Sequence, residues 1–222
     1  MTVLLIGASR GIGYELGRQY REEGRRVVAT ARDERGLARL GELGCEAVPL
    51  DVTEAASAAG FGWRIDGERF EVVVYCAGLY GPRTAALEPP SMHDFDLVMH
   101  ANVLGAMRIL PVLQGLLAQR AKVAVLSSVM GSIGGRTGTS GWLYRASKAA
   151  LNSVLKDVSL VLGPQGAVCV ALHPGWVATD MGGPSAPLTP ERSAADLRAL
   201  LARLGPQDNG RFLNHDGSAI PW

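Results

Sequence analysis

Short apolar runs alternate with longer helix-length segments along this chain. Six runs rich in Val, Ile and Leu predict strands, at residues 2–6, 26–30, 45–50, 71–76, 122–128 and 167–173. Few polar residues interrupt these runs, which is typical of strands buried on both faces in a parallel sheet covered by helices. Helices are predicted between them, at residues 11–24, 33–42, 54–60, 92–119 (as one helix or two) and 142–163.

The order of these elements indicates the fold class. Repeated strand–helix units predict an α/β fold, a doubly wound (Rossmann-type) three-layer sandwich with a mostly parallel sheet. A last helix at 190–204 and a short run at 210–214 would complete it. The Pro- and Gly-rich stretch 182–191 is interpreted as a loop, because too little chain follows it to form a second domain. We therefore expect a single domain over residues 1–222.

Composition excludes several classes of protein. The chain has 222 residues, of which 47% are hydrophobic and 19% charged, with a net charge of +1. This composition favours a globular protein and argues against partners such as nucleic acid or an anionic membrane. Neither a signal peptide nor an apolar stretch of about 18 residues is evident. The three cysteines match no metal-binding spacing. A cytoplasmic protein without a metal site is expected.

A glycine-rich loop follows the first predicted strand. The stretch GASRGIG places Gly7, Gly11 and Gly13 between that strand and the next helix. Glycines allow a tight turn and the close approach of a pyrophosphate, while the helix N-terminus offers free N–H groups. The alternative is a strand-to-helix turn whose glycines serve packing alone. As the first loop of such a sheet, it favours nucleotide binding.

Residues after the second and third strands bear on the choice of nucleotide. An acidic residue selective for NAD is usual where Ala31 stands, and Arg32 follows it. Together with Arg10, Arg32 would suit the 2′-phosphate of NADP, so NADP(H) is preferred and NAD(H) is possible. This preference would weaken if Asp33 faced the ribose instead. Asp51 either accepts a hydrogen bond from an adenine amino group or caps the helix that follows it.

Tyr144 and Lys148 stand four residues apart in the stretch YRASK. Four residues is about one helical turn, so both side chains share one face of the predicted helix. A phenol has a reference pKa of about 10, and a nearby ammonium would lower it. The pair is either a proton donor with its tuning cation or an ordinary surface pair.

Taken in order, these motifs resemble the short-chain dehydrogenase/reductase family. They are the glycine loop, Asp51, YCAGLYGP, Asn102, Ser128, the Tyr144/Lys148 pair and HPGWVATDM, over residues 3–181. The segment SSVMGSIGGRTGTSGWLYRASKAALN and the ending GRFLNHDGSAIPW are most similar to small carbonyl reductases of the sniffer and C-factor type. The resemblance implies a sheet of about seven parallel strands and hydride transfer with NAD(P)(H).

The resemblance also assigns catalytic roles. Tyr144 would donate the proton, Lys148 would tune it and hold the nicotinamide ribose, and Ser128 would bind the substrate oxygen. Ser127 competes with Ser128 for this role. Asn102 would support a proton relay through water; alternatively it only bends its helix.

The resemblance implies a larger set of cofactor-binding positions. They are Gly7, Ser9, Arg10, Gly11, Ile12, Gly13, Arg32, Asp51, Val52, Ala77, Gly78, Tyr144, Lys148, Pro174, Gly175, Val177 and Thr179. One departure is Cys76, where the family usually has Asn; we interpret it as a small buried hydrophobe. His173 is interpreted as structural, because Tyr144 already fills the role of the acid.

The predicted function is that of an NADPH-dependent oxidoreductase that interconverts a small-molecule carbonyl and an alcohol. Substrate choice is expected in the loops 79–90, 131–143 and 180–190. Five large side chains there are candidates for a substrate pocket, the core or an interface: Tyr80, Met130, Trp142, Trp176 and Met181. The resemblance implies a homodimer or homotetramer built on 92–119 and 142–163. The alternatives are an NADP(H)-binding signalling protein with little turnover and an unrelated binding domain, such as one for S-adenosylmethionine.

Overall fold

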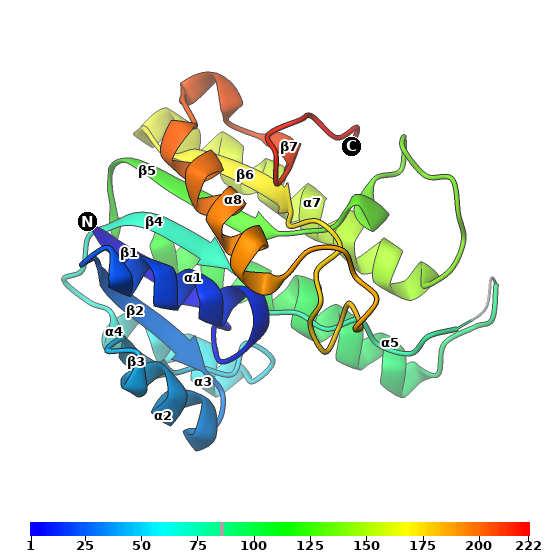
Figure 1. Ribbon diagram of the computed structural model, residues 1–222, viewed down its shortest axis with the longest axis horizontal. Coiled ribbons are helices and arrows are strands. Elements are labelled where there is room, and N and C mark those ends of the chain that lie inside the picture. Colours follow the sequence, from blue (N-terminus) through cyan, green and yellow to red (C-terminus); the bar gives the residue numbers. More distant parts are fainter. Residues whose placement is uncertain (85–86) are drawn as a thin grey trace.

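Seven parallel strands form one sheet in the computed structural model, which describes residues 1–84 and 87–222. The strand order is β3-β2-β1-β4-β5-β6-β7, so the direction of winding reverses between β1 and β4 (Figure 1). This confirms the predicted doubly wound fold, in which ligands bind at the carboxyl ends of the strands near that reversal. The strands are β1 (Thr2–Ile6), β2 (Arg26–Ala31), β3 (Glu46–Pro49), β4 (Phe70–Tyr75), β5 (Leu117–Leu126), β6 (Val168–His173) and β7 (Arg211–Asn214).

Helices cover both faces of the sheet and complete three layers (Figure 1). One face carries α1 (Gly11–Glu22), α2 (Glu34–Glu42) and α8 (Pro190–Arg203). The other carries α3 (Ala55–Ala59), α4 (Phe61–Arg64), α5 (Met92–Met99), α6 (Gly105–Ile109) and α7 (Trp142–Leu162). Short 3-10 turns are η3 (Val129–Gly131), η4 (Gly163–Gln165) and η5 (Pro206–Asp208).

The central strands are buried on both sides. In β1, Leu4 and Ile6 join the core cluster under α7, while Val3 and Leu5 join the cluster under α1 and α8. All four side chains are fully buried. The absence of polar alternation in these runs therefore reflects a sheet covered on both faces, as predicted.

The predicted helix at 92–119 was wrong at its C-terminal end. Helix α5 continues through a π-helical turn, η1 (His100–Leu104), into α6 and a 3-10 turn, η2 (Leu110–Leu113). The chain turns at Gly115, whose φ is +86°, and β5 already begins at Leu117. The left-handed glycine ends the helix, and the apolar residues after it enter the sheet. The predicted helix 54–60 corresponds to α3, and the short helix α4 that follows it was not predicted.

The helical run Met92–Leu113 is long and apolar enough to cross a membrane by length and composition alone. Half of its most apolar window is buried inside the fold. Ala106 and Ile109, for example, are fully buried in the core cluster against the sheet. Packing against the sheet accounts for the buried half of this apolar run.

Candidate active site

The predicted site residues gather where the strands end. A Cβ added to Gly7 would lie 2.8 Å from Ala77 Cα. The loops after β1 and β4 are therefore in direct contact. A Cβ on Gly78 would lie 3.0 Å from Asn102 Oδ1 and 3.4 Å from Lys148 Nζ. Residues from four separate parts of the sequence therefore meet at one edge of the sheet.

The glycine loop needs its glycines for close packing. Gly7 and Gly11 have φ of +79° and +56°, which other residues rarely adopt. A Cβ on Gly13 would lie 2.9 Å from Gly7 O and from Ala8 Cα. The glycines therefore do serve close packing, which was one of the two alternatives. Their small size lets the loop lie directly against the start of α1.

The N-terminus of α1 carries no side-chain cap. Its N-cap residue is Arg10, which has no acceptor to offer and makes no capping hydrogen bond. Helices α2, α5 and α8, by contrast, are capped by Asp33, Ser91 and Thr189. The first N–H groups of α1 thus remain available to an anion, and the helix dipole favours negative charge there. This loop fits a phosphate cradle.

Two exposed guanidinium groups stand near this cradle. The Arg10 and Arg32 side chains are 67% and 68% exposed, and Arg10 Nη1 lies 3.1 Å from Asp180 Oδ2. Asp33 Oδ1 accepts a hydrogen bond of 2.7 Å from Gly36 N, so Asp33 caps α2. The Arg10–Asp180 and Arg32–Asp33 ion pairs are exposed and therefore weak. Both guanidinium groups can bind a ligand phosphate instead.

Asp51 closes the turn before α3. Its Oδ1 accepts hydrogen bonds from Thr53 N at 2.9 Å and from Thr53 Oγ1 at 2.6 Å. The N-cap of α3 is Glu54, so the helix-cap alternative for Asp51 is not what forms. Val52 lies beside it, close under Gly105 of α6.

Tyr144 and Lys148 are both buried, with 7% and 4% of their surface exposed. They lie on the first turns of α7, which begins after Gly141 in the left-handed conformation. Lys148 Nζ donates to Leu126 O at 2.8 Å and lies 5.6 Å from the centroid of the Tyr144 ring. The interpretation as an ordinary surface pair is therefore wrong.

Burial dominates the ionisation of this pair. It raises the pKa of Tyr144, against a hydrogen bond with Ser128 that lowers it, and Tyr80 raises it further. Burial also lowers the pKa of Lys148 from 10.5 to about 8. The expected net lowering of the phenol pKa by Lys148 is not confirmed. The physical reason is that burial disfavours the charged phenolate, while Lys148 is not among the groups that lower this pKa and its ammonium donates to a backbone carbonyl instead.

The two candidate serines after β5 have different partners. Ser127 Oγ donates to Asn152 Oδ1 at 2.5 Å in the interior of the fold. Ser128 Oγ accepts from Met130 N at 3.1 Å, and Ser128 is the serine that lowers the pKa of Tyr144. The structure thus favours Ser128 over Ser127 beside the phenol.

Asn102 lies in the π-helical turn η1 and is fully buried. Its side chain exchanges two hydrogen bonds of 2.8 Å with the backbone of Leu79, which follows β4. Asn102 Nδ2 also donates to Ser147 Oγ at 2.9 Å, and Ser147 Oγ donates to Tyr144 O at 2.8 Å. Asn102 therefore connects the loop after β4 to helix α7, in addition to any bend in its own helix. The hydrogen bonds of Ser147 could not be predicted from its place in the YRASK stretch.

Side chains from two loops enclose Tyr144. The ring of Tyr80 stacks on the Tyr144 ring at 4.6 Å between centroids. The Tyr144 hydroxyl lies 3.9 Å from Met181 Sδ, and Arg83 Nη2 donates to Met181 O at 2.9 Å. Sequence reasoning named Tyr80 and Met181 but missed Arg83, a lone basic residue in a predicted substrate loop. Within the predicted loop 79–90, residues 85–86 lie outside the described part.

The loop after β6 approaches the glycine loop. Gly175 has a φ of +86°, and Val177 pairs with Leu188 in an isolated parallel bridge. A Cβ on Gly11 would lie 3.3 Å from Thr179 Cγ2. Thr179 is thus packed against the glycine loop at the start of α1. Ser9 packs on the other side of the loop, next to Gly36 of α2, and Ile12 packs against the neighbouring core.

Cys76 and His173 were interpreted as structural. Burial raises the pKa of the Cys76 thiol to about 12, which keeps it neutral. His173 has a pKa lowered to about 4, by burial and by His215. No cluster of three or more metal-ligating side chains occurs in residues 1–84 or 87–222.

The chain is similar in sequence to known reductases and dehydrogenases. The family model described as enoyl-(acyl carrier protein) reductase matches residues 7–210. A 1-hydroxy-2-glutathionyl-2-methyl-3-butene dehydrogenase from Rhodococcus sp. (strain AD45) is 33% identical, over 100% of this chain and 99% of its own.

Two solved structures are similar over 100% of this chain and 99% of theirs. One is a short-chain dehydrogenase/reductase from Burkholderia multivorans with bound NADP, with a TM-score of 0.90 and 30% identity. The other is the carbonyl reductase Sniffer of D. melanogaster, with a TM-score of 0.87 and 29% identity.

Proposed function

The chain belongs to the short-chain dehydrogenase/reductase family, and on this premise we propose that it reduces a small-molecule carbonyl to an alcohol with NADPH, or catalyses the reverse reaction. It is an oxidoreductase, like the relatives described above. The observation that carries the proposal is the buried Tyr144–Lys148 pair beside Ser128. A protein that only binds nucleotide has no need of a buried phenol and ammonium at that position.

The cofactor is NADP(H), and the residues present fit it. The uncapped first turn of α1 would hold the pyrophosphate, and Arg10 and Arg32 would hold the 2′-phosphate. Asp51 would lie at the adenine, with the neighbouring Val52. The segment Pro174–Thr179 would hold the nicotinamide end. When bound, NADPH supplies the hydride for the carbonyl carbon.

The side chains of this protein would manage the proton and the position of the substrate. Ser128 donates a hydrogen bond to the carbonyl oxygen, and Tyr144 transfers its phenolic proton to the same oxygen. Lys148 places a positive charge close to the resulting phenolate and holds the nicotinamide ribose. Asn102 keeps the loop after β4 and helix α7 in register, so that these groups stay aligned.

We also propose a single domain that assembles as a homodimer or homotetramer in the cytoplasm. Large apolar side chains are exposed on the helices expected at the interface: Met92, Phe95, Met107, Leu160 and Val161. The three cysteines are free, which suits a reducing compartment.

A panel of aldehydes and ketones tests the proposed activity. We expect NADPH oxidation, measured by absorbance, with at least one activated carbonyl compound, and slower oxidation of NADH. A panel of alcohols with NADP⁺ covers the reverse direction. Tight NADP(H) binding without turnover of any compound would favour the alternative of a nucleotide-binding signalling protein. Absence of nicotinamide binding would contradict both.

Replacing the two exposed arginines tests cofactor selection. Arg32→Ala and Arg10→Ala should each weaken NADP⁺ binding about tenfold or more, because each removes charge-assisted hydrogen bonds to the 2′-phosphate. Binding of NAD⁺ should change little. Dissociation constants from calorimetry give the ratio, with Arg69→Ala at the start of β4 as a charge-matched control. An unchanged ratio in Arg32→Ala would remove Arg32 from the cofactor site.

A further inference from the structure

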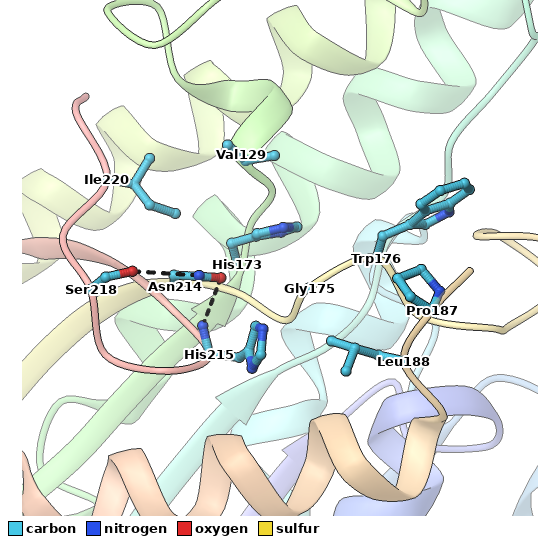
Figure 2. Close-up of a pocket in the computed structure, with 10 residues that line it drawn as sticks. All are labelled: Val129, His173, Gly175, Trp176, Pro187, Leu188, Asn214, His215, Ser218 and Ile220. Atoms are coloured by element: carbon cyan, nitrogen blue, oxygen red, sulfur yellow. Dashed lines mark hydrogen bonds between the residues drawn. The ribbon is translucent and has the colours of Figure 1, made fainter. Parts of the chain in front are cut away.

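A pocket of about 470 Å³ lies beside the candidate active site (Figure 2). Val129, which directly follows Ser128, forms one side, and Gly175 and Trp176 of the loop after β6 form another. Leu188 adds further apolar surface, while the segment after β7 supplies polar groups. The pocket therefore borders the chain segments that carry the catalytic serine and the expected nicotinamide wall. A ligand in this pocket would lie close to the segment that carries Ser128.

Asn214 and Ser218 line this pocket, but their side chains already form hydrogen bonds with each other and with neighbouring residues. Asn214 Oδ1 accepts from His215 N at 3.0 Å, and Asn214 Nδ2 donates to Ser218 Oγ at 3.4 Å. Ser218 Oγ in turn donates to Asp216 Oδ1 at 2.6 Å. The groups left to recognise a ligand are the imidazole rings of His173 and His215 (Figure 2).

His215 is held in one tautomer by Asp196 of α8. Its Nδ1 lies 3.0 Å from Asp196 Oδ2, and a carboxylate can only accept, so Nδ1 carries the proton. Arg192 fixes the same carboxylate through Nε at 2.9 Å. In the neutral ring, Nε2 therefore presents a lone pair. Nε2 lies near Gly175, where an added Cβ would lie 3.3 Å from it and only 2.3 Å from Leu188 Cδ1, so a larger residue would not fit there.

His173 lies at the end of β6 with an unused polar atom. Its Nδ1 is buried and has no hydrogen-bond partner among the residues described. A buried polar atom without a partner is costly, and because this one is closed to solvent, it is the rest of the ring, which lines the pocket, that can meet a ligand. Because burial and His215 lower its pKa to about 4, the ring is neutral near pH 7 and offers one donor and one acceptor.

We propose that this pocket is a second substrate subsite that binds a hydroxyl group of the carbonyl substrate. The ligand O–H donates to His215 Nε2, and its oxygen accepts a hydrogen bond from the neutral His173 ring. The apolar body of the substrate packs between Trp176 and Leu188. This inference rests on the proposed carbonyl reduction and narrows its substrates to apolar carbonyl compounds that carry one hydroxyl group away from the carbonyl. An ether at that position cannot donate and is bound less well.

A matched pair of substrates tests the subsite. With NADPH, kcat/KM for 4-(hydroxymethyl)benzaldehyde should exceed that for 4-(methoxymethyl)benzaldehyde about tenfold, the value of one or two buried hydrogen bonds. In His215→Phe the ratio should fall to near one, whereas His93→Phe, at an exposed position on α5, should keep the wild-type ratio. Asp196→Asn, which releases the tautomer, should lower the ratio as well. A wild-type ratio of one, or an unchanged ratio in both site variants, would overturn the subsite.

Imidazole NMR separates this inference from the proposed activity. The chain has four histidines, so each ring can be followed. We expect His215 as the Nδ1–H tautomer, and we expect 1,4-benzenedimethanol with NADP⁺ to shift the signals of His173 and His215 but not those of His93 and His100. Such shifts without turnover of any carbonyl would support the subsite and contradict the proposed function. Turnover without shifts or discrimination would contradict the subsite alone.

Discussion

Tyr144→Phe is expected to lower kcat about a thousandfold, because it removes the proton donor while leaving the ring in place. The side chain is 7% exposed and stacked on Tyr80, so the loss of one hydroxyl should not disturb the packing. Burial raises the pKa of this phenol, which keeps it protonated and ready to act as an acid near neutral pH. Steady-state kinetics with NADPH and the best carbonyl of the panel measure the effect.

The controls for this variant address folding and binding separately. Tyr20→Phe removes a hydroxyl from another buried tyrosine, on the last turn of α1, and should keep kcat. Dissociation constants for NADPH should agree within a few-fold between Tyr144→Phe and the wild type. Full activity in Tyr144→Phe would show that another group supplies the proton, and the proposed mechanism would then be wrong.

The fold could be predicted from the sequence because its signals are local. A run such as TVLLI, apolar at every position, indicates a strand buried on both faces, and β1 has the predicted bounds, Thr2–Ile6. The end of the helical run after Met92 was missed because it depends on the backbone of Gly115 and on the start of β5, which apolar periodicity does not reveal. Boundaries depend on such contacts more than on pattern.

The candidate site was predictable only where residues act through short spacings. The four-residue step from Tyr144 to Lys148 could be read directly, and the structure buries both side chains. Ser127 and Ser128, however, are distinguished by Asn152, which lies 25 positions beyond Ser127 and binds it. The Asp196–His215 pair likewise forms only when α8 and the end of β7 come together. Contacts between distant segments carry no local signal.

Lys148→Met should abolish most activity and yet stabilise the protein. Burial lowers the pKa of Lys148 from 10.5 to about 8, so a charged ammonium is kept in the interior at a cost of about 3 kcal/mol at neutral pH. Methionine removes that cost but leaves Leu126 O without its donor, a loss of about 1 kcal/mol. The expected net gain in the free energy of unfolding is about 2 kcal/mol near pH 7.

The stability difference between Lys148→Met and the wild type should depend on pH in a defined direction. Below pH 8 Lys148 is protonated in both the folded and the unfolded chain, so the whole penalty is present. Between about 8 and 10.5 the folded chain has released the proton while the unfolded chain still holds it, so the stability of the wild type rises with pH. The advantage of Lys148→Met should therefore shrink across that range, in urea unfolding followed by circular dichroism. Lys156→Met, at an exposed position on α7, should show no such trend.

Two results would contradict this prediction: a Lys148→Met protein less stable than the wild type at pH 7, or a stability difference that does not change with pH. Either would mean that the buried ammonium does not destabilise the fold. If the gain appears together with the loss of activity, the ammonium is retained for its chemistry at the expense of stability.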